Sequence, residues 1–143
     1  MSESRTLLHV WAAGRQLLVP VMDLREVVAF TQATSLPGGP RGIEGVVLHQ
    51  GEFLPVLDWG AMAGASGPLP PASVMAVLRR RLGLPLERLV GTLEVPEAGW
   101  REAPDSDPWH PILAGLCKVE EQEVPLLDPE RLLALRHRFR KDR

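Results

Sequence analysis

The chain has little of what several large classes of protein require. Cys117 is its single cysteine among 143 residues, so no disulfide can form within the chain, which suits a reducing compartment. No apolar run approaches the roughly 18 residues of a membrane-spanning helix. The N-terminal segment has no charged stretch followed by a long apolar core, so it does not resemble a signal peptide. These absences predict a soluble, cytoplasmic protein that does not insert into a membrane.

The sequence also lacks the residue patterns of catalysis and of cofactor binding. The four histidines have no zinc-type partner at metal-ligand spacing. There is no phosphate-binding Walker loop, no nucleophile elbow and no dinucleotide-binding glycine pattern. A net charge of −2 and the absence of interleaved basic and aromatic residues argue against a nucleic-acid surface. We therefore expect no enzyme activity, no cofactor, no metal and no nucleic-acid partner.

The sequence does contain a short motif that occurs twice. Gly45–Asp58 reads GVVLHQGEFLPVLD, and Gly115–Asp128 reads GLCKVEEQEVPLLD. Glycine, proline, leucine and aspartate recur at the same places at an offset of 70 residues, which marks a duplicated unit. The repeated structural positions that we follow below are Gly45, Pro55 and Asp58 in the first copy, and Gly115, Pro125 and Asp128 in the second.

Each copy of this motif predicts a β-hairpin. In the first copy two apolar runs flank the polar turn His49–Glu52, and their continuous apolar character predicts burial on both faces. Proline inside a strand predicts an edge strand or a bulge, and Pro55 and Pro125 repeat this feature. Asp58 and Asp128 end matching strands, where aspartate commonly caps the following turn or helix.

The remaining chain consists mostly of short apolar runs separated by turns. Thr6–Trp11 and Gln16–Val21 predict a further hairpin. Pro129, directly after an aspartate, predicts the start of a C-terminal helix whose basic end suits a helix C-terminus. Trp59 is expected in the core or a seam, and Trp109 under a long proline-rich loop. Many short strands with one terminal helix predict an all-β fold, built as two small barrels.

The duplication predicts how the chain is divided. We expect a single domain in which the first barrel covers residues 6–66 and the second covers residues 72–128, followed by the C-terminal helix and basic tail over residues 129–143. Ala61–Ala72 is rich in glycine, alanine and proline, and we expect it to connect the halves.

The ordered stretches resemble the CheW family, the coupling proteins of bacterial chemotaxis arrays, from roughly Thr6 to Leu135. Their order and spacing carry the resemblance more than any single piece does. The stretches that match the family pattern are Val19–Val27, Pro40–Trp59, Gly83–Leu89 and Pro125–Leu133.

The resemblance implies two five-stranded, SH3-like barrels packed about a pseudo-twofold axis. It also implies a non-catalytic scaffold or adaptor that couples the cytoplasmic signalling tips of chemoreceptors to the regulatory domain of a CheA-type histidine kinase, which carries the same fold. Such a protein would be recruited to membrane-associated receptor arrays. The alternative from the residues alone is a small β-barrel module that binds a ligand or a nucleic acid.

The resemblance also implies a receptor interface at Val21, Leu24 and Glu26. Glu26 matches an acidic position of the family that is implicated in receptor contact. Two interpretations remain open at each position. Val21 and Leu24 either line a groove between the barrels or pack in the core, and Glu26 is either a binding residue or a solvent-facing carboxylate.

The coupling loop of the family corresponds to His49, Gln50 and Gly51. The family commonly has an arginine where this chain has Gln50, and the arginine is associated with coupling. Glutamine cannot make a bidentate, charge-assisted contact to a carboxylate. This departure suggests a divergent adaptor, with altered affinity or partners, that serves an accessory chemosensory system.

Overall fold

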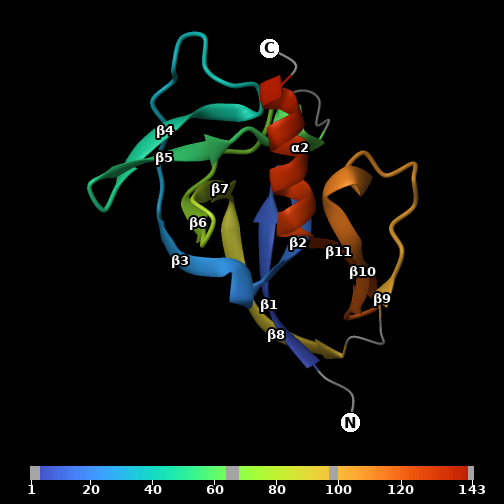
Figure 1. Ribbon diagram of the computed structural model, residues 1–143. Coiled ribbons are helices and arrows are strands. Elements are labelled where there is room, and N and C mark those ends of the chain that lie inside the picture. The colour runs from blue at the N-terminus through green and yellow to red at the C-terminus, as the bar shows by residue number, and fades with distance from the viewer. Residues whose placement is uncertain (1–3, 64–67, 97–99, 142–143) are drawn as a thin grey trace.

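The computed structural model describes residues 4–63, 68–96 and 100–141, and strands dominate its secondary structure (Figure 1). The strands of the N-terminal part are β1 (Ser4–Ala12), β2 (Arg15–Pro20), β3 (Leu24–Ala29), β4 (Ile43–His49), β5 (Glu52–Leu57) and β6 (Val74–Leu78). Those of the C-terminal part are β7 (Leu82–Leu86), β8 (Arg88–Pro96), β9 (Trp100–Arg101), β10 (Leu113–Val119) and β11 (Gln122–Leu127). The helical segments are η1 (Val21–Asp23), α1 (Trp59–Ala63), η3 (His110–Ile112) and α2 (Pro129–Lys141).

The predicted all-β fold with a short C-terminal helix is confirmed. One sheet has the order β3-β6-β7-β5-β4, and the other has the order β8-β1-β2-β11-β10-β9. The predicted hairpins are present as the antiparallel pairs β1–β2, β4–β5 and β10–β11. Among the described residues no helix is long and apolar enough to cross a membrane.

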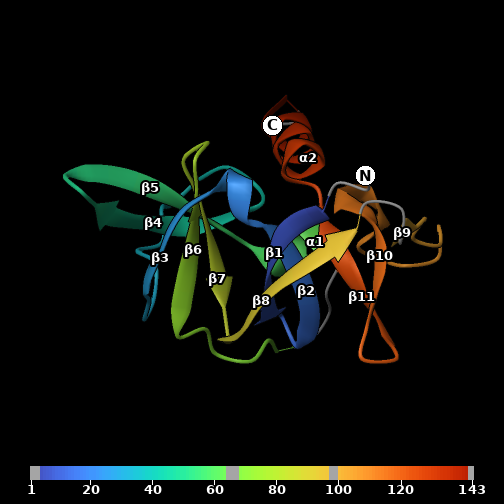
Figure 2. The same cartoon turned by 90° about the horizontal axis from the view of Figure 1, so that it is seen from below.

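The predicted boundary between the barrels is wrong, because each sheet takes strands from both halves of the chain. β1 and β2 belong to the first half but pair with strands of the second, and β6 and β7 do the reverse. The hairpin β1–β2 thus joins the sheet that holds β10 and β11, and the hairpin β6–β7 joins the sheet that holds β4 and β5. Figure 2 shows the two sheets side by side. The division into residues 6–66 and 72–128 therefore separates the repeats but not the sheets. Residues 64–67 of the predicted connection and the side chains of residues 136–143 in the basic tail lie outside the described part.

The two sheets nevertheless share one plan, as the pseudo-twofold relation predicts. The strands β3, β6, β7, β5 and β4 correspond in order to β8, β1, β2, β11 and β10. In each sheet the hairpin exchanged from the other half of the chain, β6–β7 or β1–β2, pairs with the repeated hairpin. The contact is short and parallel, and it joins β7 to β5 in one sheet and β2 to β11 in the other. The second sheet has six strands instead of the expected five because β9 adds to its edge.

Each sheet closes by a contact to the outer strand of the repeated hairpin, and the repeated glycines lie at these contacts. Thr34, which follows β3, exchanges two backbone hydrogen bonds with Val46 on β4, with N–O distances of 2.8 and 2.9 Å. β9, which follows β8, pairs with β10. A Cβ atom on Gly45 would lie 2.3 Å from the backbone oxygen of Thr34, and one on Gly115 would lie 2.7 Å from that of Arg101. The glycine of the repeat is therefore a requirement of closure.

The repeated prolines do not mark edge strands. Pro55 and Pro125 lie in β5 and β11, which are interior strands, so the edge prediction is wrong. The register shifts that indicate bulges occur in the partner strands β4 and β10, next to Gly45 and Gly115. On its other side β5 pairs with β7 at a single residue pair. A proline without an N–H therefore interrupts no continuous ladder there.

The repeated aspartates cap the helices that follow them, as predicted. The backbone N–H of Ala61 donates to Oδ1 of Asp58 over 3.3 Å, and that of Glu130 donates to Oδ1 of Asp128 over 3.0 Å. These contacts satisfy N–H groups in the first turns of α1 and α2, which have no partner within the helix.

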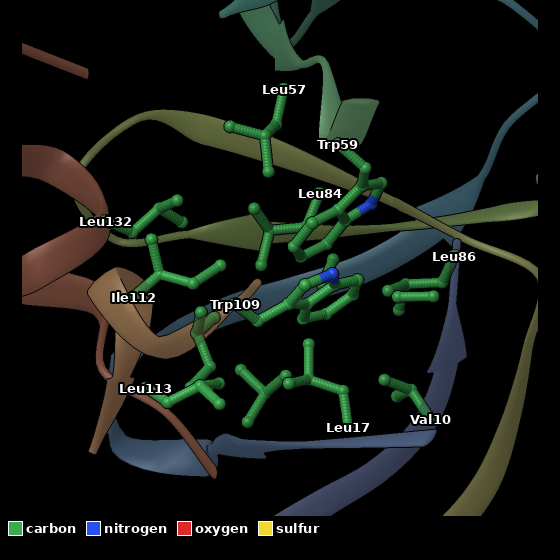
Figure 3. Close-up of a cluster of buried hydrophobic side chains, with 14 of the residues drawn as sticks. Val10, Leu17, Leu57, Trp59, Leu84, Leu86, Trp109, Ile112, Leu113 and Leu132 are labelled. Atoms are coloured by element: carbon green, nitrogen blue, oxygen red, sulfur yellow. The ribbon is translucent and has the colours of Figure 1, made fainter. Parts of the chain in front are cut away.

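Apolar side chains gather in three clusters, one inside each sheet and one between the sheets. Cys117 belongs to the cluster inside the six-stranded sheet, and burial raises the pKa of its thiol to about 11. The central cluster takes residues from both sheets and from α2, and it contains Trp59 and Trp109 (Figure 3). The two rings stack with centroids 5.1 Å apart and an interplanar angle of 8°. Trp59 also donates its indole N–H to the Pro85 carbonyl over 2.7 Å.

A polar contact holds the Trp109 segment from the outside. The Arg15 guanidinium donates to both carboxylate oxygens of Asp107 over 2.7 and 2.5 Å, and it lies 5.2 Å from the centre of the Trp109 ring. Asp107 also accepts a hydrogen bond from the Trp109 backbone N–H. The Arg15 hydrogen bonds are the main reason why the pKa of Asp107 is lowered, although burial opposes them. The Asp107 side chain is only 9% exposed, whereas that of Arg15 is 32% exposed, so the carboxylate is shielded from solvent more than the guanidinium.

Replacing Asp107 with asparagine is expected to lower the free energy of unfolding by about 2 kcal/mol at pH 7, because a mostly buried, charge-assisted contact is lost. The pKa of Asp107 is lower in the folded state, so the ionised carboxylate stabilises the fold above roughly pH 4. This stabilisation disappears as the pH falls through the folded-state pKa. Urea unfolding at pH 7 and pH 3 checks this, and an undiminished difference between wild type and variant at pH 3 would contradict it.

Candidate protein-interaction surface

Barrel closure brings the predicted receptor residue Glu26 to the predicted coupling loop. Glu26 lies on β3 and His49 ends β4, and these strands stand at opposite ends of the sheet order. Because the segment after β3 closes the sheet against β4, the two side chains meet although 23 residues separate them. Figures 1 and 2 both place the turn of the β4–β5 hairpin at the end of the molecule away from β9.

A small hydrogen-bonded network joins these residues. The Glu26 carboxylate contacts Nε2 of His49, and the Gln50 amide donates to the same carboxylate over 3.4 Å. The Arg25 guanidinium donates to the side-chain amide oxygen Oε1 of Gln50 over 2.9 Å. The His49 side chain is 9% exposed, whereas that of Glu26 is 35% exposed. Glu26 therefore presents a half-exposed carboxylate that is held from behind by a buried imidazole.

The turn conformation explains why Gln50 and Gly51 can reach this position. Their φ angles are 51° and 79°, both in the left-handed region that a two-residue hairpin turn with the right twist requires. Glycine adopts this conformation without steric strain, and Gly51 has no atom within 4 Å of an added Cβ. The equivalent turn of the second hairpin uses Glu120 and Glu121 with φ angles of 47° and 68°.

The other two receptor candidates lie against the core. Leu24 is buried in the central cluster, so the core-packing alternative holds for it. Val21 is half-buried and packs against the same cluster. These residues are close to Glu26 in sequence, but Leu24 has little surface to offer a partner.

Sequence reasoning missed the exposed apolar pair of the β4–β5 hairpin. Leu48 and Phe53 face each other across β4 and β5, and they are 71% and 73% exposed. The prediction that both faces of this hairpin are buried is therefore wrong. The two-residue alternation of a strand could have indicated this exposure, because residues 46, 48, 53 and 55 share the face opposite to the buried Leu54. The inward face is also apolar, so the sequence shows no alternation of apolar and polar residues that would distinguish the two faces.

The duplicated hairpin provides an internal comparison for this face. The residues equivalent to Leu48 and Phe53 are Lys118 and Glu123, which also face each other across β10 and β11 and are exposed. Glu123 pairs with Arg101, with an N–O distance of 2.7 Å. The same position of the same fold thus accepts a charged pair. The architecture that the two copies share therefore does not explain the exposed apolar pair of the first hairpin.

A hollow of about 420 Å³ lies beside the connection between the halves, and it is lined in part by Trp59, Pro70, Glu44, Asp58 and Glu87. Burial raises the pKa of Glu44, and the nearby Asp58 adds to this effect. Asp58 caps α1, and Glu87 accepts a hydrogen bond from a backbone N–H, so both carboxylates have structural partners. Within the described residues no group of histidine, cysteine and carboxylate side chains has the arrangement of a metal site.

Comparison with known proteins identifies the family to which this chain belongs. The model of the CheW-like domain matches residues 6–137, which is nearly the whole chain. The chain belongs to the CheW-like domain family. The network of Glu26, His49 and Gln50 therefore lies within a CheW-like domain.

Named relatives agree with this membership. The CheW-like chain is 26% identical over 136 residues to a probable chemotaxis protein CheW of Rhizobium etli, covering 91% of this chain and 88% of that protein. It is also 26% identical over 130 residues to the chemotaxis protein CheW of Rhizobium meliloti, covering 87% and 84%. The crystal structure of the scaffolding protein TtCheW from Thermoanaerobacter tengcongensis superposes with a TM-score of 0.76, at 17% identity, covering 89% of this chain and 86% of that one. That likeness supports the fold described above.

Proposed function

We propose that this CheW-like domain is a non-catalytic adaptor that couples the cytoplasmic tips of chemoreceptors to the regulatory domain of a CheA-type histidine kinase. Family membership supports the adaptor role, since the relatives are named as chemotaxis proteins and the structural neighbour as a scaffolding protein. The departure at Gln50 supports a place in an accessory chemosensory system. Such an adaptor works by surface complementarity and needs no reacting group.

The observation that carries the proposal is the exposed pair Leu48 and Phe53. Two large apolar side chains, 71% and 73% exposed, stand on the β4–β5 hairpin where the second copy has a lysine and a glutamate. Exposed apolar groups that the shared architecture does not explain favour a binding surface. We assign this face to the kinase regulatory domain.

We assign Glu26 to the receptor tip. Its carboxylate is half-exposed and held by His49 and Gln50, so a cationic group of a receptor helix meets an ordered partner. The hairpin face and Glu26 belong to the same barrel. One barrel can therefore contact a kinase and a receptor at neighbouring surfaces.

Exchanging the hairpin face for its duplicate tests the kinase contact. The double variant Leu48→Lys, Phe53→Glu copies the charged pair of the second hairpin and is expected to keep the wild-type melting temperature. Affinity for the regulatory domain of the organism's own chemotaxis-type kinase should fall at least about tenfold, because fully burying a leucine or phenylalanine side chain contributes about 1.5–3 kcal/mol. Calorimetric titration of the folded proteins measures the loss.

Glu26→Lys is the matched variant for the second partner. It should weaken binding of the receptor tip, measured in the same way, while leaving the kinase titration unchanged. The hairpin double variant should show the opposite selectivity. Absence of wild-type binding to both partners would refute the adaptor proposal, and equal effects of both variants on both partners would refute the separation into two surfaces.

A further inference from the structure

Arg25 places a guanidinium group at the tip of the β4–β5 hairpin, although it belongs to β3. Its side chain is exposed, and its Nη2 donates to Oε1 of Gln50 over 2.9 Å. Gln50 follows Leu48 by two positions, a distance of about 7 Å along an extended chain. A cation is therefore held close to the exposed apolar pair Leu48 and Phe53.

The charge of Arg25 is not matched by a carboxylate. Within the described residues Arg25 forms no ion pair, and its hydrogen bond goes to a neutral amide. Other exposed arginines do have anionic partners. Arg80 pairs with Glu130 and Arg101 pairs with Glu123, each with an N–O distance of 2.7 Å. A guanidinium has five N–H donors in a planar fork that fits a carboxylate. Arg25 can therefore bind an acidic group from outside the chain.

The neighbouring charged side chains fix Arg25 without neutralising it. Glu52, beside the turn, already pairs with Arg81 at an N–O distance of 3.0 Å. The amide nitrogen of Gln50 donates to the Glu26 carboxylate, while its oxygen accepts from Arg25. Both ends of this amide are engaged, so Gln50 holds the guanidinium in a defined place.

The second hairpin carries the opposite charge at the same place. The turn residues equivalent to Gln50 and Gly51 are Glu120 and Glu121, which share their left-handed backbone conformation. The shared fold therefore accepts either sign of charge at this tip. A carboxylate on a partner would be attracted by Arg25 and repelled by Glu120, and such like-charge contacts suppress wrong pairings.

We propose that Arg25 is a specificity-determining residue of the hairpin face, where it binds a carboxylate of the kinase regulatory domain. Gln50 is the positioning residue that holds the guanidinium. The partner surface that fits is an apolar pocket for Leu48 and Phe53 with an acidic side chain at its rim. Arg25 thereby directs this partner to the first hairpin and away from the second. This inference rests on the assignment of the hairpin face to the kinase proposed above.

The test titrates the kinase regulatory domain into wild type and Arg25→Gln at two salt concentrations. In about 0.1 M NaCl the variant should bind about three- to fivefold more weakly, the upper range for an exposed ion pair. Raising the salt to about 1 M shortens the screening length from about 10 Å to about 3 Å, so the two affinities should converge. A loss that persisted in high salt would reflect packing instead of charge and would contradict the proposal.

Arg101→Gln is the matched control. It removes an exposed arginine beside the second hairpin and changes the net charge of the chain by the same amount. It should bind the kinase domain as wild type does at both salt concentrations. An equal loss in Arg101→Gln would mean that the partner senses only the overall charge, which would overturn the role of Arg25.

Exchanging the two hydrogen-bonded side chains tests whether the charge itself is recognised. The double variant Arg25→Gln, Gln50→Arg moves the guanidinium from β3 to the turn and keeps one donor and one acceptor at the tip. It should recover most of the affinity that Arg25→Gln loses. A double variant that binds no more tightly than Arg25→Gln would show that a cation at the tip is not what the partner recognises.

The pattern of losses separates this inference from the adaptor proposal. If Leu48→Lys, Phe53→Glu lowers the kinase affinity but Arg25→Gln does not, the adaptor proposal stands and the inference is wrong. Arg25→Gln should not weaken binding of the receptor tip, and a loss confined to that titration would place the cation in the other surface and overturn the inference. Absence of wild-type binding to the kinase domain would refute both.

Discussion

Replacing Trp109 with alanine is expected to lower the free energy of unfolding by about 4 kcal/mol, the range typical of a buried tryptophan. The side chain is 4% exposed and lies in the central cluster between the sheets. Its ring stacks on that of Trp59 at a centroid distance of 5.1 Å, and such pairs add stabilisation beyond the area they bury. Alanine would leave a large cavity where the two sheets meet. Urea unfolding followed by circular dichroism measures the loss.

Trp11→Ala is the control for this prediction. Trp11 is half-buried at the surface, with the Arg88 guanidinium 5.2 Å from its ring centre, so its loss opens no internal cavity. We expect this variant to lower the free energy of unfolding by about 1 kcal/mol, since an exposed cation–π contact contributes little. Equal losses for the two tryptophans would mean that the central stack does not hold the sheets together.

A double-mutant cycle with Trp59 isolates the stack itself. Trp59 and Trp109 share one contact, so their separate losses should not add, and a coupling energy of about 1 kcal/mol is expected. The sequence placed Trp59 in the core or a seam and Trp109 under a loop. It did not predict that the two rings meet, because the segments that carry them lie 50 residues apart.

Local features of the fold could be predicted from the sequence because their causes are local. The hairpins follow from apolar runs around turns, and the caps at Asp58 and Asp128 follow from aspartate before a helix. The exchange of hairpins between the sheets could not be predicted in this way. It depends on contacts such as Val56 with Gly83, which join distant segments and leave no periodic signal in either.

The candidate site was only partly accessible for a related reason. The family resemblance gave Glu26 as a receptor candidate and Gln50 as a separate coupling-loop candidate, and it did not predict that closure of the sheet brings their side chains within 3.4 Å. It could not assign Leu24 to the core or separate Leu48 from the buried residues beside it. Burial is decided by which face of a strand meets the core, and continuous apolar runs do not reveal that face.

Comparison of the two copies is the most informative tool that the sequence and the fold offer together. Positions that agree in both copies, such as Gly45 and Gly115, are those that the architecture requires. Positions that differ at the same place in the fold are not fixed by the architecture that the two copies share. Leu48 differs from Lys118 in this way, which is why it supports a binding surface.

Gly45→Ala tests whether closure of the sheet requires glycine at this position. It is expected to lower the free energy of unfolding by about 3 kcal/mol. The new Cβ would lie 2.3 Å from the backbone oxygen of Thr34 and 2.7 Å from its carbonyl carbon. Backbone atoms cannot rotate away, so the two hydrogen bonds between Thr34 and Val46 that close the sheet must lengthen or break. Thermal and urea unfolding measure the loss.

The other close-packed glycines calibrate this prediction. Gly115→Ala meets the backbone oxygen of Arg101 at 2.7 Å in the equivalent place, and we expect a loss of about 2 kcal/mol. Gly83→Ala meets Sδ of Met75 at 2.5 Å, but this atom is the flexible end of a side chain and can move, so about 1 kcal/mol is expected. A loss at Gly45 no greater than at Gly83 would mean that the closing contact can shift freely. Glycine at this place of the repeat would then need another cause. We expect Gly45→Ala and Gly115→Ala each to lower the free energy of unfolding more than Gly83→Ala does. That order would show that both copies of the repeat keep glycine because it is required for closure of the sheet.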